Sequence, residues 1–368
     1  MAILVLLPFF CATVSGNSAS DKASAVDALF REYDRPGVPG ACVLVIKQGK
    51  VLYKKAYGLA NLEEKIATTT ETNYRLASVT KQFTAMSIMI LAERGRLSHE
   101  SKLTDFFPDF PAYSKQITIR HLLTHTSGVA DYEDLIPEGT TAQLKDQQVL
   151  DLVKQQKDPL FRPGSRFRYS NSGYALLALI VEKASGELFP EFLRKNIFEP
   201  LGMSNTVAYE EGVSVVPNRA YGYSQGPNGF QRKDQSLTSA VLGDGGIYSS
   251  VEDLYRWDQA LDSARLVSRE TLTQAFTPGA MTSHDGRAYG FGWFIETYRG
   301  LQTVWHYGST VGFGTAIERF PDRKFTVIVL INRDEADAHQ LARKVVDLYL
   351  FNARSNHRAS RGSRLAAE

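Results

Sequence analysis

The spacing of apolar residues predicts one long buried helix after Leu76. Apolar side chains recur there at steps of three and four residues until Gly95, which is the repeat of an α-helix. They are Phe83, Met86, Ile90 and Leu91. Because the intervening positions are also largely apolar, we expect this helix to lie in the core, with Ser78 in its first turn.

Short β-like runs predict strands near both ends of the chain. Residues 41–47 and 51–57 are joined by Gln48-Gly49, which is typical of a hairpin. Three further predicted strands lie close to the C-terminus, at 289–297, 314–320 and 325–332. A shorter β run precedes His306.

Helical patterns occupy the middle of the chain and flank the predicted strands. The first predicted helix covers residues 21–34 and the last covers 336–351. Between them lie predicted helices at 141–154, 172–185, 187–197 and after the capping-box pattern Ser249-Ser250-Val251-Glu252. Between Asn205 and Gly243 the sequence predicts no long element.

This distribution predicts an α/β fold of the α+β sandwich type. The N- and C-terminal strands form one antiparallel sheet flanked by the first and last helices, and a mostly helical region is inserted between them. The Ser78 helix lies at the junction, which is a common place for a site. Since neither a repeat nor a linker divides the chain, we expect residues 17–352 to form one domain.

The composition is sufficient for a large hydrophobic core and argues against a nucleic-acid-binding groove. The chain has 368 residues, of which 43% are hydrophobic, and a formal net charge of only +2. Residues 353–368 alone carry a net +3, and this segment is rich in Ser and Arg without an apolar pattern. We therefore predict a disordered basic tail at 353–368 and no nucleic-acid partner.

The first residues resemble a secretory signal. The apolar run at 2–13 is too short to span a bilayer and is followed by the small residues Ser15 and Gly16. We predict a signal peptide at 1–16, a periplasmic or secreted protein, and no membrane span after its removal. Cys42 would then be the only cysteine, so no internal disulfide is expected.

Ser78 and Lys81 form the chain's only Ser-x-x-Lys and are a candidate nucleophile and helper. The first N–H groups of a helix lack internal partners and carry partial positive charge, so they stabilise an anion beside Ser78. Lys81 lies on the same helix face. A buried lysine there loses its proton more easily than in water and can activate a serine hydroxyl. The alternative is an N-cap serine and a solvated lysine.

Two further patterns complete the candidate site. Tyr169 and Asn171 lie two residues apart on a loop before a predicted helix, and they offer a phenol for proton transfer and an amide that can bond a lysine and a substrate carbonyl. A core tyrosine beside an Asn cap is the alternative. In His306-Tyr307-Gly308-Ser309 the histidine can reach a cleft, and the Ser309 N–H can complete an oxyanion hole with that of Ser78.

His284-Asp285-Gly286 also fits the pattern His-x-Gly. His306 is preferred because it adjoins a predicted sheet strand, whereas His284 lies in a polar loop.

In chain order, Ser-x-x-Lys, Tyr-x-Asn and His-x-Gly resemble the motifs of serine hydrolases related to class C β-lactamases, D,D-peptidases and β-lactamase-like esterases. The resemblance extends to residues 121–128, 163–174 and 243–246 and covers most of residues 25–350. It implies a β-lactamase/transpeptidase-like fold.

The resemblance also implies roles for the site residues and a reaction. Ser78 would be the acylated nucleophile, with Lys81 and Tyr169 sharing proton transfer. Asn171 would position the substrate, and His306, Gly308 and Ser309 would take the place of the third motif in substrate binding. The expected reaction is hydrolysis of an amide or ester, in a D-amino-acid-containing peptide or a small ester, without a cofactor or metal.

The third motif departs from that of the antibiotic-hydrolysing relatives, which have Lys-Thr-Gly. Here Tyr307 is bulky and His306 is uncharged at its ordinary pKa at neutral pH, so we expect weak β-lactamase activity at most. The alternative function is a penicillin- or cell-wall-peptide-binding protein that acylates and deacylates slowly.

Two other motifs have alternative interpretations. His121 and His125 lie four apart, which on one helix would suit zinc, but the glutamate of metallopeptidases is missing. Residues 243–246 are glycine-rich, but no lysine follows at the P-loop spacing, which favours a tight turn.

Overall fold

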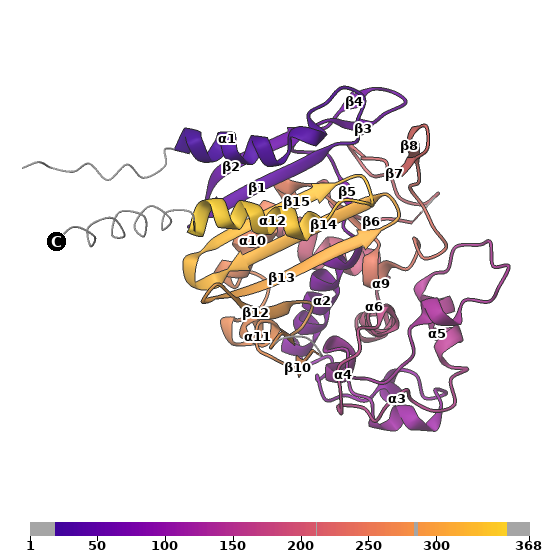
Figure 1. Cartoon of the computed structure of the whole chain (residues 1–368). Coiled ribbons are helices and arrows are strands. Elements are labelled where there is room, and N and C mark those ends of the chain that lie inside the picture. Colours follow the sequence, from indigo (N-terminus) through magenta and orange to yellow (C-terminus); the bar gives the residue numbers. More distant parts are fainter. Residues whose placement is uncertain (1–18, 211, 283–285, 352–368) are drawn as a thin grey trace, which may run out of the picture.

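A computed structural model describes residues 19–210, 212–282 and 286–351, which leaves the predicted signal peptide and basic tail outside. Its centre is an eight-stranded antiparallel sheet with the order β10-β11-β12-β13-β14-β15-β1-β2 (Figure 1). Strand β1 (Ala41–Lys47) pairs with β2 (Lys50–Tyr57) and with β15 (Phe325–Ile331). The two ends of the chain therefore share one sheet, as the sequence predicts.

The sheet is covered on both faces. Helices α1 (Ala19–Leu29) and α12 (Ala338–Val346) pack on one face, over Val43 and Val329. Leu44 and Ile328 point to the other face, into the core shared with the helical region. Successive residues of a strand point to opposite faces, and both faces of the sheet are buried here. Strands β1 and β15 are therefore nearly continuous apolar runs.

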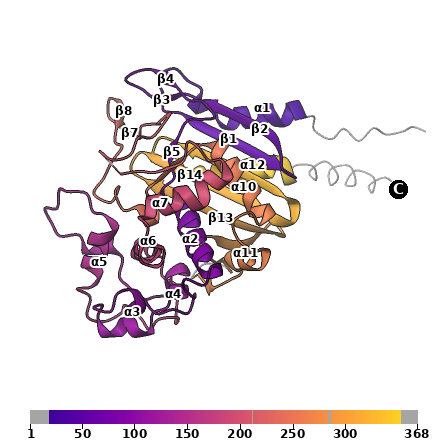
Figure 2. The same cartoon turned by 180° about the vertical axis from the view of Figure 1, so that it is seen from behind.

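The inserted helical region lies behind and below the sheet (Figures 1 and 2). Its helices are α2 (Lys81–Glu93), α3 (Leu103–Phe106), α4 (Ile119–Leu123), α5 (Asp146–Val153), α6 (Asn171–Ser185), α7 (Phe189–Leu193), α8 (Glu199–Leu201), α9 (Leu242–Gly245), α10 (Val251–Ser263) and α11 (Arg269–Ala275). Helix α6 packs on α2, α5 and α9. The predicted Ser78 helix, α2, is thus the helix of this region that packs on α6, α7, α9 and α11.

The remaining strands are short, apart from three in the main sheet. The sheet strands are β10 (Ala280–Met281), β11 (Ala288–Tyr289), β12 (Phe294–Tyr298), β13 (Leu301–Thr310) and β14 (Phe313–Phe320). The others are β3 (Leu59–Asn61), β4 (Ile66–Ala67), β5 (Tyr74–Arg75), β6 (Val207–Ala208), β7 (Tyr223–Gly226), β8 (Gly229–Arg232) and β9 (Ile247–Ser249).

The sequence predicted only a short β run before His306, whereas β13 is a ten-residue strand between β12 and β14. Thr303, Val304, Trp305 and His306 are all buried, because both faces of the sheet are covered there. The alternation of apolar and polar residues that signals a half-exposed strand is therefore missing. His306 therefore lies within a strand of the sheet, whereas the sequence predicted that it only adjoins one.

Several predicted elements differ from the structure in their bounds. The helix predicted at 21–34 ends at Leu29, and the helix predicted at 336–351 is α12, followed by a π-helical turn over Asp347–Phe351. The strand predicted at 289–297 is interrupted after Tyr289 and resumes at Phe294. The helix predicted at 141–154 begins only at Asp146, because Lys145 is extended and forms its N-cap. The helix predicted at 187–197 is α7, followed by a π-helical turn over Arg194–Phe198.

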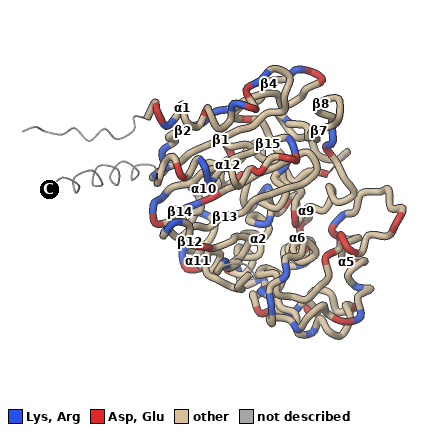
Figure 3. Tube along the Cα trace, in the orientation of Figure 1, with Lys and Arg blue, Asp and Glu red and all other residues tan. Residues whose placement is uncertain are grey.

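Acidic and basic residues are interspersed along the described trace, without a face of one sign (Figure 3). In the same residues, none of the helices combines the length and the apolar character needed to cross a bilayer.

Candidate active site

Ser78 lies in a 3₁₀ turn, Ala77–Thr80, that leads directly into α2. The preceding residue, Ala77, has a φ of +47°, in the left-handed region that non-glycine residues adopt rarely and at a cost. The chain therefore turns sharply between β5 and α2, and Ser78 stands at the start of the helix. The predicted first turn is this 3₁₀ turn.

Lys81 is buried beneath Ser78 and donates three hydrogen bonds. Its Nζ lies 3.0 Å from Ser78 Oγ, 2.8 Å from Asn171 Oδ1 and 2.9 Å from the main-chain oxygen of Asp244. Burial lowers the pKa of Lys81 to about 8, although the nearby carboxylate of Asp244 acts in the opposite direction. About a tenth of the amine is thus neutral at pH 7, far more than for a lysine in water.

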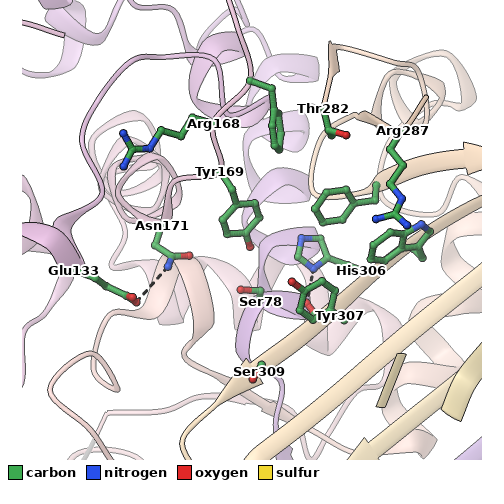
Figure 4. Close-up of a pocket in the computed structure, with 13 residues that line it drawn as sticks. Ser78, Glu133, Arg168, Tyr169, Asn171, Thr282, Arg287, His306, Tyr307 and Ser309 are labelled. Atoms are coloured by element: carbon green, nitrogen blue, oxygen red, sulfur yellow. Dashed lines mark hydrogen bonds between the residues drawn. The ribbon is translucent and has the colours of Figure 1, made fainter. Parts of the chain in front are cut away.

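Tyr169 lies beside Ser78, and its hydroxyl points toward the serine (Figure 4). The buried hydroxyl makes no hydrogen bond of standard geometry within the described residues. Burial raises the pKa of Tyr169 well above its usual value, and the neighbouring Ser78 hydroxyl acts against this shift. The tyrosine ring stacks on His125 at 4.2 Å and lies 5.0 Å from Lys81 Nζ, which fixes its position.

Asn171 begins α6 and links Lys81 to an acidic side chain. Its Oδ1 accepts from Lys81, and its Nδ2 donates to Glu133 Oε1 at 3.2 Å (Figure 4). Its main-chain N–H donates to Asp131 Oδ2 at 2.7 Å. The predicted contact between amide and lysine is therefore present.

His306 is buried, and both of its ring nitrogens bond to protein groups. Nδ1 lies 2.7 Å from the Tyr307 carbonyl oxygen, and Nε2 lies 3.0 Å from the Tyr289 hydroxyl. Since a carbonyl only accepts, Nδ1 carries the proton and Nε2 accepts from tyrosine. Burial, with Lys81 nearby, lowers the pKa of His306 to about 3. The imidazole lines the cavity as a neutral ring with no free nitrogen.

Gly308 allows β13 to pass directly beside the Ser78 turn. A Cβ at this position would lie 2.1 Å from the Leu76 carbonyl oxygen and 2.5 Å from Thr315 Oγ1. Such separations are far below contact distance, so only glycine fits. This close approach places Ser309 at the cavity that Ser78 also lines.

Replacing Gly308 by alanine is expected to lower kcat/KM more than about tenfold and also to lower the melting temperature. The new methyl group would push β13 away from the Ser78 turn, because the atoms that it meets include rigid backbone. Gly245→Ala is the matched control, since its Cβ would lie 3.6 Å from Ala77 Cα, an ordinary contact. Equal effects of the two substitutions on kcat/KM would contradict this interpretation.

Ser78 opens into a cavity of about 630 Å³. Its lining includes Ser78, Glu133, Phe167, Arg168, Tyr169, Asn171, Thr282, Arg287, Phe294, Trp305, His306, Tyr307 and Ser309 (Figure 4). Every predicted site residue except Lys81 and Gly308 is part of this lining, and those two lie directly behind it. The cavity combines an aromatic wall with one acidic and two basic side chains.

Sequence reasoning missed these charged residues. Arg287 pairs with Glu296 at 2.8 Å, and Arg168 lies 3.5 Å from Asp134. Arg168 directly precedes Tyr169, which was the one available signal. Glu133 and Arg287 belong to no short motif, so only the fold brings them to the site.

The two histidines considered as zinc ligands, His121 and His125, are each bonded to a different segment. His121 lies in α4, where its Nδ1 accepts the Thr118 N–H, whereas His125 follows the helix with a φ of +57° and accepts the Ser170 N–H. Across the described residues, no group of three or more His, Cys, Asp or Glu could hold a metal. The second His-x-Gly, at His284, lies outside the described residues. Residues 243–246 form the short helix α9 and its end.

The fold agrees with comparisons to known proteins. Penicillin-binding protein 4* of Bacillus subtilis (strain 168) is 32% identical over 338 residues, covering 88% of this chain and 74% of that protein. A D-aminopeptidase of Cereibacter sphaeroides (strain ATCC 17029 / ATH 2.4.9) is 28% identical, covering 92% of this chain and 65% of that protein.

A solved structure of similar shape is the octameric penicillin-binding protein homologue from Pyrococcus abyssi. It has a TM-score of 0.79 at 30% identity, covering 89% of this chain and 76% of that chain. The family model described as Beta-lactamase matches residues 26–350, which include every element from β1 to α12. The chain therefore belongs to the beta-lactamase family.

Proposed function

We propose that the chain is a serine hydrolase that cleaves an amide or ester bond through an acyl-enzyme on Ser78. The observation that supports this most directly is the 3.0 Å contact between Lys81 Nζ and Ser78 Oγ at the floor of an open cavity. A buried lysine with a lowered pKa beside a serine hydroxyl is a base next to a nucleophile.

The reaction proceeds in two steps. Tyr169 and Lys81 take the proton from Ser78 as Oγ attacks the carbonyl carbon, and the oxyanion accepts hydrogen bonds from the N–H groups of Ser78 and Ser309. The carbonyl re-forms as the leaving amine or alcohol departs with that proton. Water then attacks the ester, losing a proton to the same pair, and Ser78 regains its hydrogen as the acid leaves.

The substrate in this proposal is a D-amino-acid-containing peptide or a small ester. A D-aminopeptidase is among the relatives, and the cavity is lined by aromatic rings that suit an apolar acyl group. β-Lactam hydrolysis is weak at most, because Tyr307 replaces a small threonine and His306 is neutral, so neither holds a carboxylate.

We also propose that residues 1–16 are a signal peptide, that 17–352 form the catalytic domain and that the protein acts in the periplasm or outside the cell. The short apolar run at 2–13 supports this location.

A substrate panel tests the proposed function. We expect hydrolysis of p-nitrophenyl acetate and of D-amino-acid amides, and nitrocefin turnover at least about a hundredfold slower, since only the β-lactam depends on the missing third-motif contacts. Each rate is read as kcat/KM on the mature chain. Nitrocefin as the best substrate would overturn the substrate assignment, and inactivity on every member would overturn the hydrolase itself.

The second candidate is a receptor that acylates and stays blocked, which the relatives named as penicillin-binding proteins favour. Mass spectrometry of the intact chain over time separates the two. A transient adduct on Ser78 indicates a hydrolase, and an adduct that persists for hours indicates a receptor.

A further inference from the structure

Among the described residues, the direct hydrogen-bond partners of Lys81 do not include a carboxylate. Ser78 Oγ, Asn171 Oδ1 and the Asp244 main-chain oxygen are all neutral acceptors, and the lysine side chain is fully buried. A buried ammonium is strongly disfavoured unless an opposite charge lies near it. Its charge must therefore be balanced by a carboxylate that it does not touch.

Asp244 lies in the best position to supply that charge. Its main-chain oxygen is 2.9 Å from Lys81 Nζ, and its side chain is enclosed in the same part of the core, with 6% exposure. The Tyr132 hydroxyl donates to Asp244 Oδ2 at 3.0 Å, and Tyr132 is itself held by the bond from its N–H to Ser172 Oγ. The carboxylate is thus fixed in orientation close to the lysine.

The other groups around Lys81 come from four further segments. They are Asp131 and Glu133 beside the 3₁₀ turn Tyr132–Leu135, His125 after α4, Tyr169 and Tyr174 at α6, and His306 in β13. Both histidines are neutral, because burial lowers their pKa values far below the ordinary range. The tyrosines are neutral as well, since burial raises theirs.

The two remaining carboxylates are less suited to this role. Asp131 accepts the main-chain N–H groups of Asn171 and Glu133, which already stabilise its charge. Glu133 is exposed and lines the open cavity, where solvent screens its charge. Asp244 also raises the pKa of Lys81 more than either of them does, and Lys81 in turn opposes the burial that raises the pKa of Asp244 to about 7.

We propose that Asp244 is the buried counter-ion of Lys81 and a positioning residue for acyl transfer. Its carboxylate, oriented by Tyr132, decides at which pH the Lys81 amine becomes free to accept the Ser78 proton. This inference rests on the proposed hydrolase function. It adds a role for a residue that never contacts the substrate.

The pH profile of kcat/KM for p-nitrophenyl acetate tests the counter-ion. In the wild type the acidic limb lies near the Lys81 pKa of about 8. In Asp244→Asn the amide still accepts the Tyr132 hydrogen bond but has no charge to stabilise the ammonium. The limb is therefore expected to move at least about one unit to lower pH, so that the fraction of maximal activity retained at pH 6 rises about tenfold.

Two further variants keep the test independent of folding. Tyr132→Phe removes only the hydroxyl that stabilises the carboxylate, so the limb should move in the same direction by a smaller amount. Asp146→Asn is the matched control, because Asp146 is equally buried but acts on Asp244 and not on Lys81. When the negative charge of Asp146 is removed, Asp244 ionises more readily, so the acidic limb should stay in place or move slightly to higher pH.

If the acidic limb of the pH profile does not move in folded Asp244→Asn, Asp244 is not the counter-ion of Lys81. If Asp244→Asn does not fold, an unmoved limb in Tyr132→Phe has the same meaning. If activity still depends on Ser78 in either case, the proposed hydrolase function is unaffected. Activity that does not depend on Ser78 would instead contradict the proposed function.

Discussion

Ser78→Ala is expected to reduce kcat/KM at least about a thousandfold on every ester or amide that the wild type hydrolyses. Without the hydroxyl no acyl-enzyme forms, and the remaining groups supply only orientation and oxyanion stabilisation. Lys81 keeps its bonds to Asn171 and Asp244, so the site stays assembled around the missing oxygen. The melting temperature should remain within a few degrees of the wild-type value, which thermal unfolding will show.

The matched control is Ser165→Ala, which changes a serine in the neighbouring cavity that shares Phe167 and Arg168 with the site. Its activity should stay within about twofold of the wild type. If Ser78→Ala retains more than about a thousandth of the activity, another group is the nucleophile. Mass spectrometry would then locate the acyl adduct elsewhere.

Lys81→Ala and Tyr169→Phe should each cost about a thousandfold, and the double variant should cost little more than either alone. Lys81 Nζ lies 3.0 Å from Ser78 Oγ, and the Tyr169 hydroxyl points toward Ser78 (Figure 4). In the proposed mechanism both side chains share one proton, so neither retains its function without the other. Tyr169→Phe removes a hydroxyl that holds no other group in place among the described residues, so its effect on stability should be small. The kcat/KM values of the four proteins form a double-mutant cycle.

Tyr113→Phe serves as the control for loss of a tyrosine hydroxyl away from the site, because the Tyr113 hydroxyl donates a 3.3 Å hydrogen bond to Gln156 and does not line the cavity. It should leave kcat/KM within about twofold. Multiplication of the two single effects in the double variant would mean that Lys81 and Tyr169 act independently, and it would contradict a shared proton path. Lys81→Met, which keeps the length of the side chain, checks that the loss is not a packing effect.

The parts of the fold that follow from local sequence patterns could be predicted. The apolar repeat before Gly95 gave α2, and the strand runs gave β1 and β15 with bounds close to those observed. Ser78 and Lys81 belong to one helical turn, so their contact also follows from local geometry. Their meeting with Tyr169 depended on the resemblance of three motifs, and not on any pattern within one segment.

Other parts of the site depend on contacts that no local pattern contains. The sequence predicted that His306 could reach a cleft, but it did not predict that its Nε2 accepts a hydrogen bond from the Tyr289 hydroxyl, two strands away in the sheet. Asp244 looked like part of a turn, and its partner Tyr132 is 112 residues away in the chain. Side chains of this kind acquire their environment only when the whole fold has formed, which is why the surroundings of His306 and Asp244 could not be predicted.

The pairing of β1 with β15 has a consequence for biosynthesis. Ala41 lies opposite Ile331, so this pair joins positions about 290 residues apart, and loop closure of that length makes formation of the sheet late and slow. In a nascent chain β1 can pair with β2 early, but the edge that later faces β15 stays open until that strand emerges. The unfinished protein thus presents an apolar strand with one open edge during most of translation, and we expect it to need a chaperone to keep that edge from aggregating.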